Sequence, residues 1–252
     1  MIIYLSPIIT LVILVFLFSV LFFRKRKLTF MDNVLTYGIP LVLIMIIPYH
    51  QLERLLLNTM AGLWPVFSIN TIMTLIELSL LYIIMTSLSR KEKIIDLNLF
   101  PIYLLIGLGM GSGHFLRDVV LVWYHPLSGY FGYSQFSSFI TGFYLAQEVF
   151  QALLFVVSAG FIGLGCIRMA KGQSVLGITS LIYAFLIIEI DSIIRVLFQY
   201  VPSFSFFASV YVISLLPLLF ILGSAFLWYS YRRQERRESE LKKDDSETSP
   251  TS

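Results

Sequence analysis

The sequence predicts an all-helical, polytopic membrane protein with seven transmembrane helices, and composition and apolar patterning carry that prediction. Of the 252 residues, 58% are hydrophobic and 13% are charged, whereas soluble domains carry roughly 25% charged residues. The mean hydropathy is +0.85. Apolar runs long enough to cross a bilayer recur along the whole chain, and short loops separate them. These features indicate a chain that lies largely within a lipid bilayer.

Seven segments are long enough to cross a hydrocarbon core about 30 Å thick, because a helix rises about 1.5 Å per residue. They are residues 2–23, 34–57, 66–89, 99–124, 140–167, 174–200 and 207–231. We therefore expect one transmembrane domain over residues 1–231. Residues 232–252 contain six basic and six acidic residues, and this composition favours a largely disordered cytoplasmic tail.

The basic residues that flank these segments follow every second one. They are Arg24, Lys25, Arg26 and Lys27; Arg90, Lys91 and Lys93; Arg168 and Lys171; and Arg232, Arg233, Arg236 and Arg237. The intervening loops at 58–65, 125–139 and 201–206 contain no lysine or arginine. Because cytoplasmic loops are enriched in these residues, the N-terminus is expected outside and the C-terminus in the cytoplasm.

The same features limit the classes of partner. The net charge of +3 resides in short loops beside apolar segments, which is typical of topology signals and not of a nucleic-acid surface. Cys166 is the single cysteine, so a disulfide framework is excluded. The basic residues of the first segment follow its apolar run, so we expect a retained anchor and not a cleaved signal peptide. The expected partners are the lipid bilayer and possible companion membrane proteins, with no nucleic acid.

Polar residues interrupt the fourth segment in "GLGMGSGHFLRD". Gly107, Gly111, His114 and Asp118 follow a 4-3-4 spacing, which places them on one helical face. The two glycines predict close packing against another helix. His114 and Asp118 then point into the protein interior, where the aspartate can fix the tautomer of the histidine. A functional site and a structural hydrogen-bond network both fit this pattern.

Further ionisable residues lie within other predicted spans, where each is a functional candidate because charge is costly in lipid. Glu77 lies in the third span, Glu148 in the fifth, and Glu189 and Asp191 in the sixth. Asp191 and Arg195 are spaced i and i+4, which predicts a structural ion pair. The candidate catalytic residues are therefore Glu77, His114, Glu148 and Glu189. In the predicted orientation they all fall in the middle or outer half of the membrane, which predicts an outward-facing polar cavity.

The layout of the chain resembles a known group of membrane proteins. A basic first loop precedes "DNVLTYGIP", the third span contains "LIELSLLY", the fourth "GLGMGSGH" and the fifth "AQEVFQALLF". This order is similar to that of the YhfC-type intramembrane metalloproteases and of their relative, the anterior-pharynx-defective subunit of gamma-secretase. The resemblance implies a seven-helix fold and either zinc-dependent proteolysis or a scaffolding role.

The ligand pattern of the protease members is incomplete in this chain. Ile76 precedes Glu77 where those members have a second glutamate, and residues 140–200 contain no histidine. Zinc requires about three protein ligands, and the candidate ligands here are His114, Glu148 and Asp191. We therefore expect a noncatalytic scaffold or partner-binding protein. The alternatives are an intramembrane metal-dependent hydrolase, and a transporter or small-ligand-binding membrane protein.

Overall fold

The computed structural model describes residues 63–91, 97–124, 138–200 and 214–248. These residues form α4 (Leu63–Lys91), the short 3-10 helix η3 (Leu97–Leu99), α5 (Phe100–Tyr124), α6 (Ser138–Ala170), α7 (Ser174–Tyr200) and α9 (Leu216–Thr248). No strand occurs in this part of the chain, so the all-helical prediction is confirmed for it. The predicted spans 2–23 and 34–57 lie outside the described residues.

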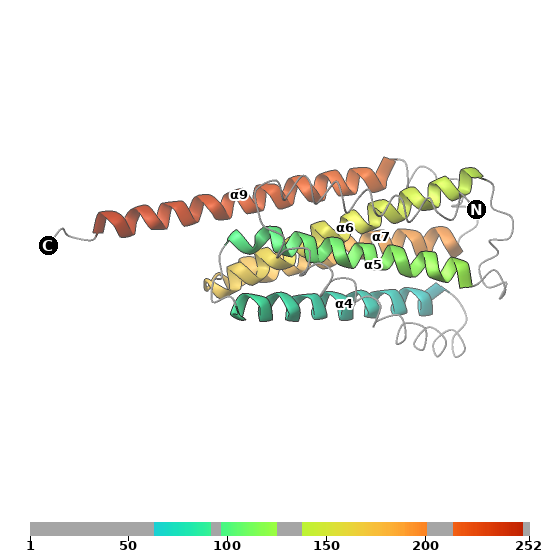
Figure 1. Cartoon of the computed structure of the whole chain (residues 1–252), viewed down its shortest axis with the longest axis horizontal. Coiled ribbons are helices and arrows are strands. Elements are labelled where there is room, and N and C mark those ends of the chain that lie inside the picture. The colour runs from blue at the N-terminus through green and yellow to red at the C-terminus, as the bar shows by residue number, and fades with distance from the viewer. Residues whose placement is uncertain (1–62, 92–96, 125–137, 201–213, 249–252) are drawn as a thin grey trace.

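Helix α6 is the central element of the described bundle. It packs against α4, α5, α7 and α9, and the long helices run side by side along one axis (Figure 1). The apolar window Val149–Ala170 in α6 is 89% buried, against 35% for Phe67–Ser87 in α4 and 44% for Ser174–Ile194 in α7. The core therefore forms around α6, while α4, α7 and α9 each expose large apolar side chains.

Three described helices are long and apolar enough to cross a membrane, namely those that contain Phe67–Ser87, Val149–Ala170 and Ser174–Ile194. In α5 the apolar stretch Phe100–Gly111 is shorter. The predicted spans at 66–89, 99–124, 140–167 and 174–200 coincide with α4, α5, α6 and α7 to within three residues at each end. A membrane protein is consistent with these helices, whereas the count of seven spans and their orientation stay predictions.

Large apolar side chains on the outer faces of the helices support lipid contact. On α7 they recur every three or four residues, at Val175, Ile178, Ile182, Leu186 and Ile190. Val175 is 79% exposed, and Ile178 and Ile182 are each 52% exposed. A soluble monomer rarely exposes so continuous an apolar stripe, because water disfavours it. A bilayer removes that penalty, so the stripe fits a helix whose outer face meets lipid.

A tight turn joins α6 to α7 and fixes the geometry at the basic end of the bundle. Gly172 has φ of +75°, which only glycine adopts without strain. The amide of Gly172 donates to the carbonyl of Met169 at 3.1 Å, and that of Gln173 to the carbonyl of Arg168 at 2.8 Å. These bonds satisfy the last carbonyls of α6. The turn therefore places Arg168 directly beside the first turns of α7.

The segment after residue 231 continues the helix that precedes it. Helix α9 continues to Thr248 and extends past the other helices (Figure 1). Arg232 Nη1 lies 2.8 Å from Glu235 Oε2, one turn along the helix, and Lys171 Nζ lies 2.5 Å from Glu238 Oε1. The first pair lies at helical spacing and stabilises an exposed helix, and the second joins α9 to the turn between α6 and α7.

Candidate functional site

The glycines of α5 bring it into backbone contact with α6. A Cβ atom on Gly111 would lie 2.5 Å from the carbonyl oxygen of Ala152, and one on Gly107 would lie 2.8 Å from that of Phe155. Real Cβ atoms do not approach backbone atoms so closely, so only glycine fits at these two positions. Because of this close approach, the next turn of α5, which carries His114, also packs against α6.

His114 is buried between three helices. Its ring stacks on Phe155 of α6, with centroids 4.3 Å apart and planes 13° from parallel. Its Nε2 atom lies 3.0 Å from Oε2 of Glu77 on α4. Both residues are 4% exposed. Glu77 is therefore a partner that the sequence did not indicate. The side chain of Asp118 lies outside the described residues, so its contact with His114 stays a prediction.

The chemistry of this pair follows from burial. A buried carboxylate without a partner is costly, whereas one that accepts a hydrogen bond from an imidazole N–H is stabilised. When Nε2 of His114 donates to Glu77, the Nδ1 atom of a neutral ring carries a lone pair. Nδ1 is buried and has no hydrogen-bond partner among the described residues. The arrangement can therefore hold a proton between two helices or present one ring nitrogen to a further group.

A second polar contact ties α4 to α7. Thr71 Oγ1 donates to Oε1 of Glu189 at 2.5 Å, across 118 residues of chain. Glu189 is 5% exposed, and its Oε2 atom is buried with no hydrogen-bond partner among the described residues. Glu189 thus receives a hydrogen bond from another helix, through Thr71. Helix α4 therefore supplies one polar contact to α5 and one to α7.

The remaining candidates are placed only in part. Asp191 is 1% exposed on α7. The side chains of Glu148 and Arg195 lie outside the described residues, so the Asp191–Arg195 ion pair stays a prediction. Within the described part of the chain, no three His, Cys, Asp or Glu side chains come together as a metal site would require. The described residues alone therefore do not form the set of about three ligands that zinc needs.

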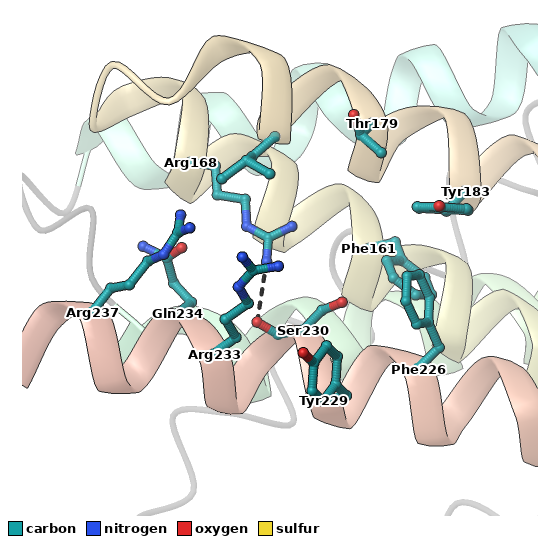
Figure 2. Close-up of a pocket in the computed structure, with 11 residues that line it drawn as sticks. Phe161, Arg168, Thr179, Tyr183, Phe226, Tyr229, Ser230, Arg233, Gln234 and Arg237 are labelled. Carbon is teal, nitrogen blue, oxygen red and sulfur yellow. Dashed lines mark hydrogen bonds between the residues drawn. The ribbon is translucent and has the colours of Figure 1, made fainter.

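Sequence reasoning missed a buried cation at the opposite end of the bundle. Arg168 was assigned to a basic loop, but it belongs to α6 and is 8% exposed. Its Nη1 donates to Ser180 Oγ at 2.7 Å, and its Nη2 donates to the carbonyl oxygen of Ser230 at 3.1 Å. Figure 2 shows it reaching from α6 toward α9. Arg168 is therefore a buried cation near the C-terminal end of α6, and no local pattern in the sequence distinguished it from a loop arginine.

The fold and these contacts define an all-helical protein with membrane-length helices that are joined by buried polar side chains. Comparison of the chain with protein families, with curated proteins and with solved structures finds no match. The geometry and chemistry of the described residues are therefore the grounds for assigning a function.

Proposed function

We propose that the chain is a multi-pass protein of the cell membrane that acts as a noncatalytic scaffold or partner-binding protein. In this proposal it crosses the membrane seven times, with the N-terminus outside and the C-terminus in the cytoplasm. The membrane-length helices and the apolar stripe on α7 support the membrane part. The alternation of basic and non-basic loops supports the orientation.

The observation that carries the scaffolding role is the pairing of buried ionisable residues across helices. Glu77 contacts His114 on α5, and Glu189 contacts Thr71 on α4. Such contacts hold helices together in lipid, where few other partners for polar groups exist. Residues that bond to one another in this way hold the helices in fixed relative positions. They thereby define the shape of the outer surface on which a partner would dock.

The outward-facing polar cavity is retained as part of the proposal. Glu77 lies halfway along α4, and Thr71 lies nearer its N-terminal end, away from the basic end of the bundle. In the proposed orientation these positions fall in the middle and outer half of the membrane. The layout resemblance to YhfC-type proteases and to the gamma-secretase subunit favours the same architecture, with the scaffolding role of the latter.

One observation favours a metal-dependent hydrolase as the second candidate. Metal-binding histidines commonly donate one ring N–H to a carboxylate while the other nitrogen binds the metal. His114 has this arrangement with Glu77, and its Nδ1 is buried without a partner among the described residues. His114 supplies one ligand, whereas zinc needs roughly three. This candidate therefore depends on side chains beyond those described, such as Glu148.

Purification in a mild detergent, with metal analysis and mass measurement, distinguishes the two candidates. The scaffold proposal predicts substoichiometric zinc and a companion membrane protein that remains bound to both the wild type and His114→Ala. One zinc per chain that is lost in His114→Ala, with helical content unchanged, would replace the scaffold by the hydrolase. A chain that purifies alone from its native membrane, with no zinc, would contradict both candidates.

A further inference from the structure

A cavity lies between α6, α7 and α9 at the basic end of the bundle. Its volume is about 190 Å³, far above the roughly 10–15 Å³ that one water molecule requires. The polar residues that line it include Arg168, Thr179, Tyr183, Tyr229, Arg233 and Arg237. Figure 2 shows the guanidinium groups of Arg233 and Arg237 rising from α9 on the same side as that of Arg168. Three cations from two helices thus border one cavity.

No carboxylate neutralises these three arginines among the described residues, where every ion pair involves other cations. Two acidic side chains on α9 pair with other cations. Glu238 pairs with Lys171, and Glu235 pairs with Arg232. The positive charge around the cavity is therefore not balanced by the described part of the protein.

The interior of the cavity contains polar groups with unused bonding capacity. Arg168 is more than nine-tenths buried, and its Nε atom has no hydrogen-bond partner among the described residues. Gln234, which is 1% exposed, also has an Oε1 atom without such a partner. A buried guanidinium that lacks a counter-ion is strongly destabilising. An anion in the cavity would remove that penalty and accept the unused N–H.

The other end of the cavity is apolar. Phe161, Tyr183 and Phe226 form an aromatic cluster, with the Tyr183 and Phe226 rings 4.8 Å apart and the Phe161 and Phe226 rings 5.7 Å apart. In Figure 2 the aromatic side chains lie at one end and the arginines at the other. The cavity is therefore amphipathic, with a cationic end and an aromatic end.

We propose that this cavity binds a phosphate-bearing anion through Arg168, Arg233 and Arg237. Guanidinium groups bind phosphate oxygens with paired, charge-assisted hydrogen bonds, and arginine suits this role better than lysine does. The phosphate belongs either to an anionic phospholipid headgroup or to a soluble phosphate compound. The aromatic end and the apolar helix faces are compatible with a lipid, whose acyl chains would continue along the bundle.

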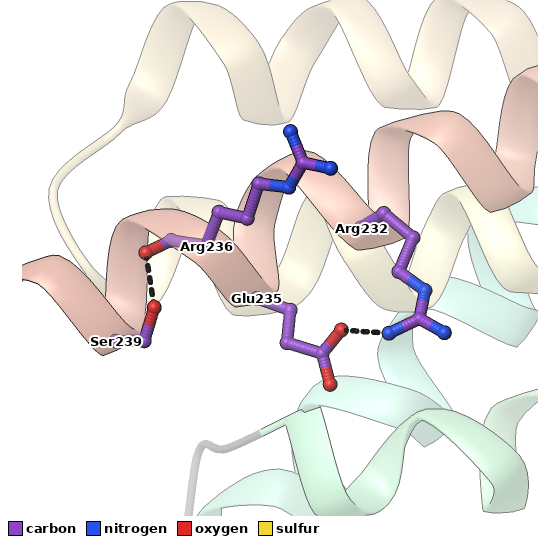
Figure 3. A network of polar contacts seen from close by, with 4 residues as sticks. All are labelled: Arg232, Glu235, Arg236 and Ser239. Atoms are coloured by element: carbon purple, nitrogen blue, oxygen red, sulfur yellow. Dashed lines mark hydrogen bonds and ion pairs between the residues drawn. The ribbon is translucent and has the colours of Figure 1, made fainter.

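The experiment uses the full chain purified in a neutral detergent, with two double variants of α9 that remove the same charge. Arg233→Gln/Arg237→Gln removes two cavity cations. Arg232→Gln/Arg236→Gln is the matched control, since neither residue lines the cavity. Figure 3 shows Arg232 paired with Glu235, and Arg236 one turn further along α9 than Arg232. Arg232 also stacks over the Trp228 ring at 4.6 Å. The thermal midpoint of each variant is measured first.

The probes are phosphatidylglycerol, phosphatidylcholine and inorganic phosphate, with bound ligand quantified by native mass spectrometry and by calorimetry. The wild type and the Arg232/Arg236 control are expected to bind phosphatidylglycerol at least about tenfold more tightly than phosphatidylcholine. The Arg233/Arg237 variant is expected to lose that preference at an unchanged thermal midpoint. Arg168→Gln should also lose the preference for phosphatidylglycerol. Because Arg168 is buried, its substitution can destabilise the fold, so the conclusion rests on the two α9 variants.

The outcomes separate the sources of the phosphate. A lipid preference lost only in the Arg233/Arg237 variant supports a phospholipid headgroup. Inorganic phosphate binding with the same variant dependence, without a lipid preference, supports a soluble phosphate compound. Equal losses in both double variants would indicate general attraction of a basic surface for anions and would overturn the proposal. Absence of binding by the wild type to either anionic probe would also overturn it.

Discussion

Nε2 of His114 lies 3.0 Å from Oε2 of Glu77, and this contact joins α5 to α4 inside the bundle. Helix α4 packs mainly on α7 and α6, and α5 packs mainly on α6. The contact therefore links two helices that are both seated on α6, at a point where each residue is 4% exposed. Its position depends on the backbone contact of α5 with α6, which the glycines permit.

Gly111→Ala tests that dependence. The added methyl would lie 2.5 Å from the carbonyl oxygen of Ala152 and 2.7 Å from its Cα, so α5 must move away from α6. We expect the free energy of unfolding to fall by about 1–3 kcal/mol, the usual cost of overpacking. The measurement is reversible denaturation in detergent, followed by helical circular dichroism.

Gly223→Ala is the matched control for that variant. On α9 an added Cβ would meet only side-chain atoms, Val157 Cγ1 at 3.3 Å and Ile187 Cδ1 at 3.5 Å, and no backbone atom. We expect a change below about 1 kcal/mol, because these distances are near ordinary van der Waals contact. Equal effects of the two variants would show that the close approach at Gly111 is not special.

The helices of this region could be predicted from the sequence, because apolar length and glycine spacing are local properties. The predicted span 174–200 matches α7, Ser174–Tyr200, at both ends. Polar partners could not be predicted in the same way. Glu77 and His114 are 37 residues apart, and Thr71 and Glu189 are 118 apart. Such contacts depend on the rotation and depth of whole helices, which no local spacing encodes.

Thr71→Val tests the contact between α4 and α7. The substitution keeps the shape of the side chain but removes the hydroxyl that donates to Glu189. Glu189 Oε2 already has no hydrogen-bond partner among the described residues. The variant removes the donor to Oε1 as well, so neither oxygen of this buried carboxyl keeps a donor from the described residues. We expect a loss of about 1–3 kcal/mol in the free energy of unfolding.

Thr86→Val, on the same helix, is the control for that measurement. Thr86 Oγ1 bonds to the carbonyls of Tyr82 and Ile83, each at 2.9 Å, so its contacts stay within α4. Bonds of this kind add little to helix stability. We expect a change within about 0.5 kcal/mol, as for most peripheral substitutions. If the Thr71 variant is as stable as the Thr86 variant, the contact between Thr71 and Glu189 does not stabilise the bundle.

Arg168 illustrates a different limit of sequence reasoning. Basic residues at the end of an apolar run are normally topology signals in a loop, and Arg168 fits that pattern. In the structure its long side chain instead reaches across to Ser180 and to the backbone of Ser230. The backbone position was thus nearly correct, whereas the direction of the side chain depends on α9, which lies 62 residues further along the chain.

Single-cysteine labelling tests the proposed orientation. In a background that carries Cys166→Ala, Ser128→Cys lies in the proposed outer loop and Ser252→Cys in the proposed cytoplasmic tail. A membrane-impermeant maleimide added to intact cells should label Ser128→Cys only, and after permeabilisation it should label both. Labelling of the tail in intact cells, with the loop protected, would reverse the orientation. Labelling of both in intact cells would contradict the odd number of spans, three, that the proposal puts between residues 128 and 252.

The most direct test of the structural role of the polar contact is a double-mutant cycle on Glu77 and His114. Glu77→Leu and His114→Phe each leave one buried partner unsatisfied, so each should lower the free energy of unfolding by about 1–3 kcal/mol. The double variant replaces both with apolar groups and should lose clearly less than the sum. A coupling energy of about 1 kcal/mol or more is the predicted result, whereas additivity within about 0.5 kcal/mol would contradict the account.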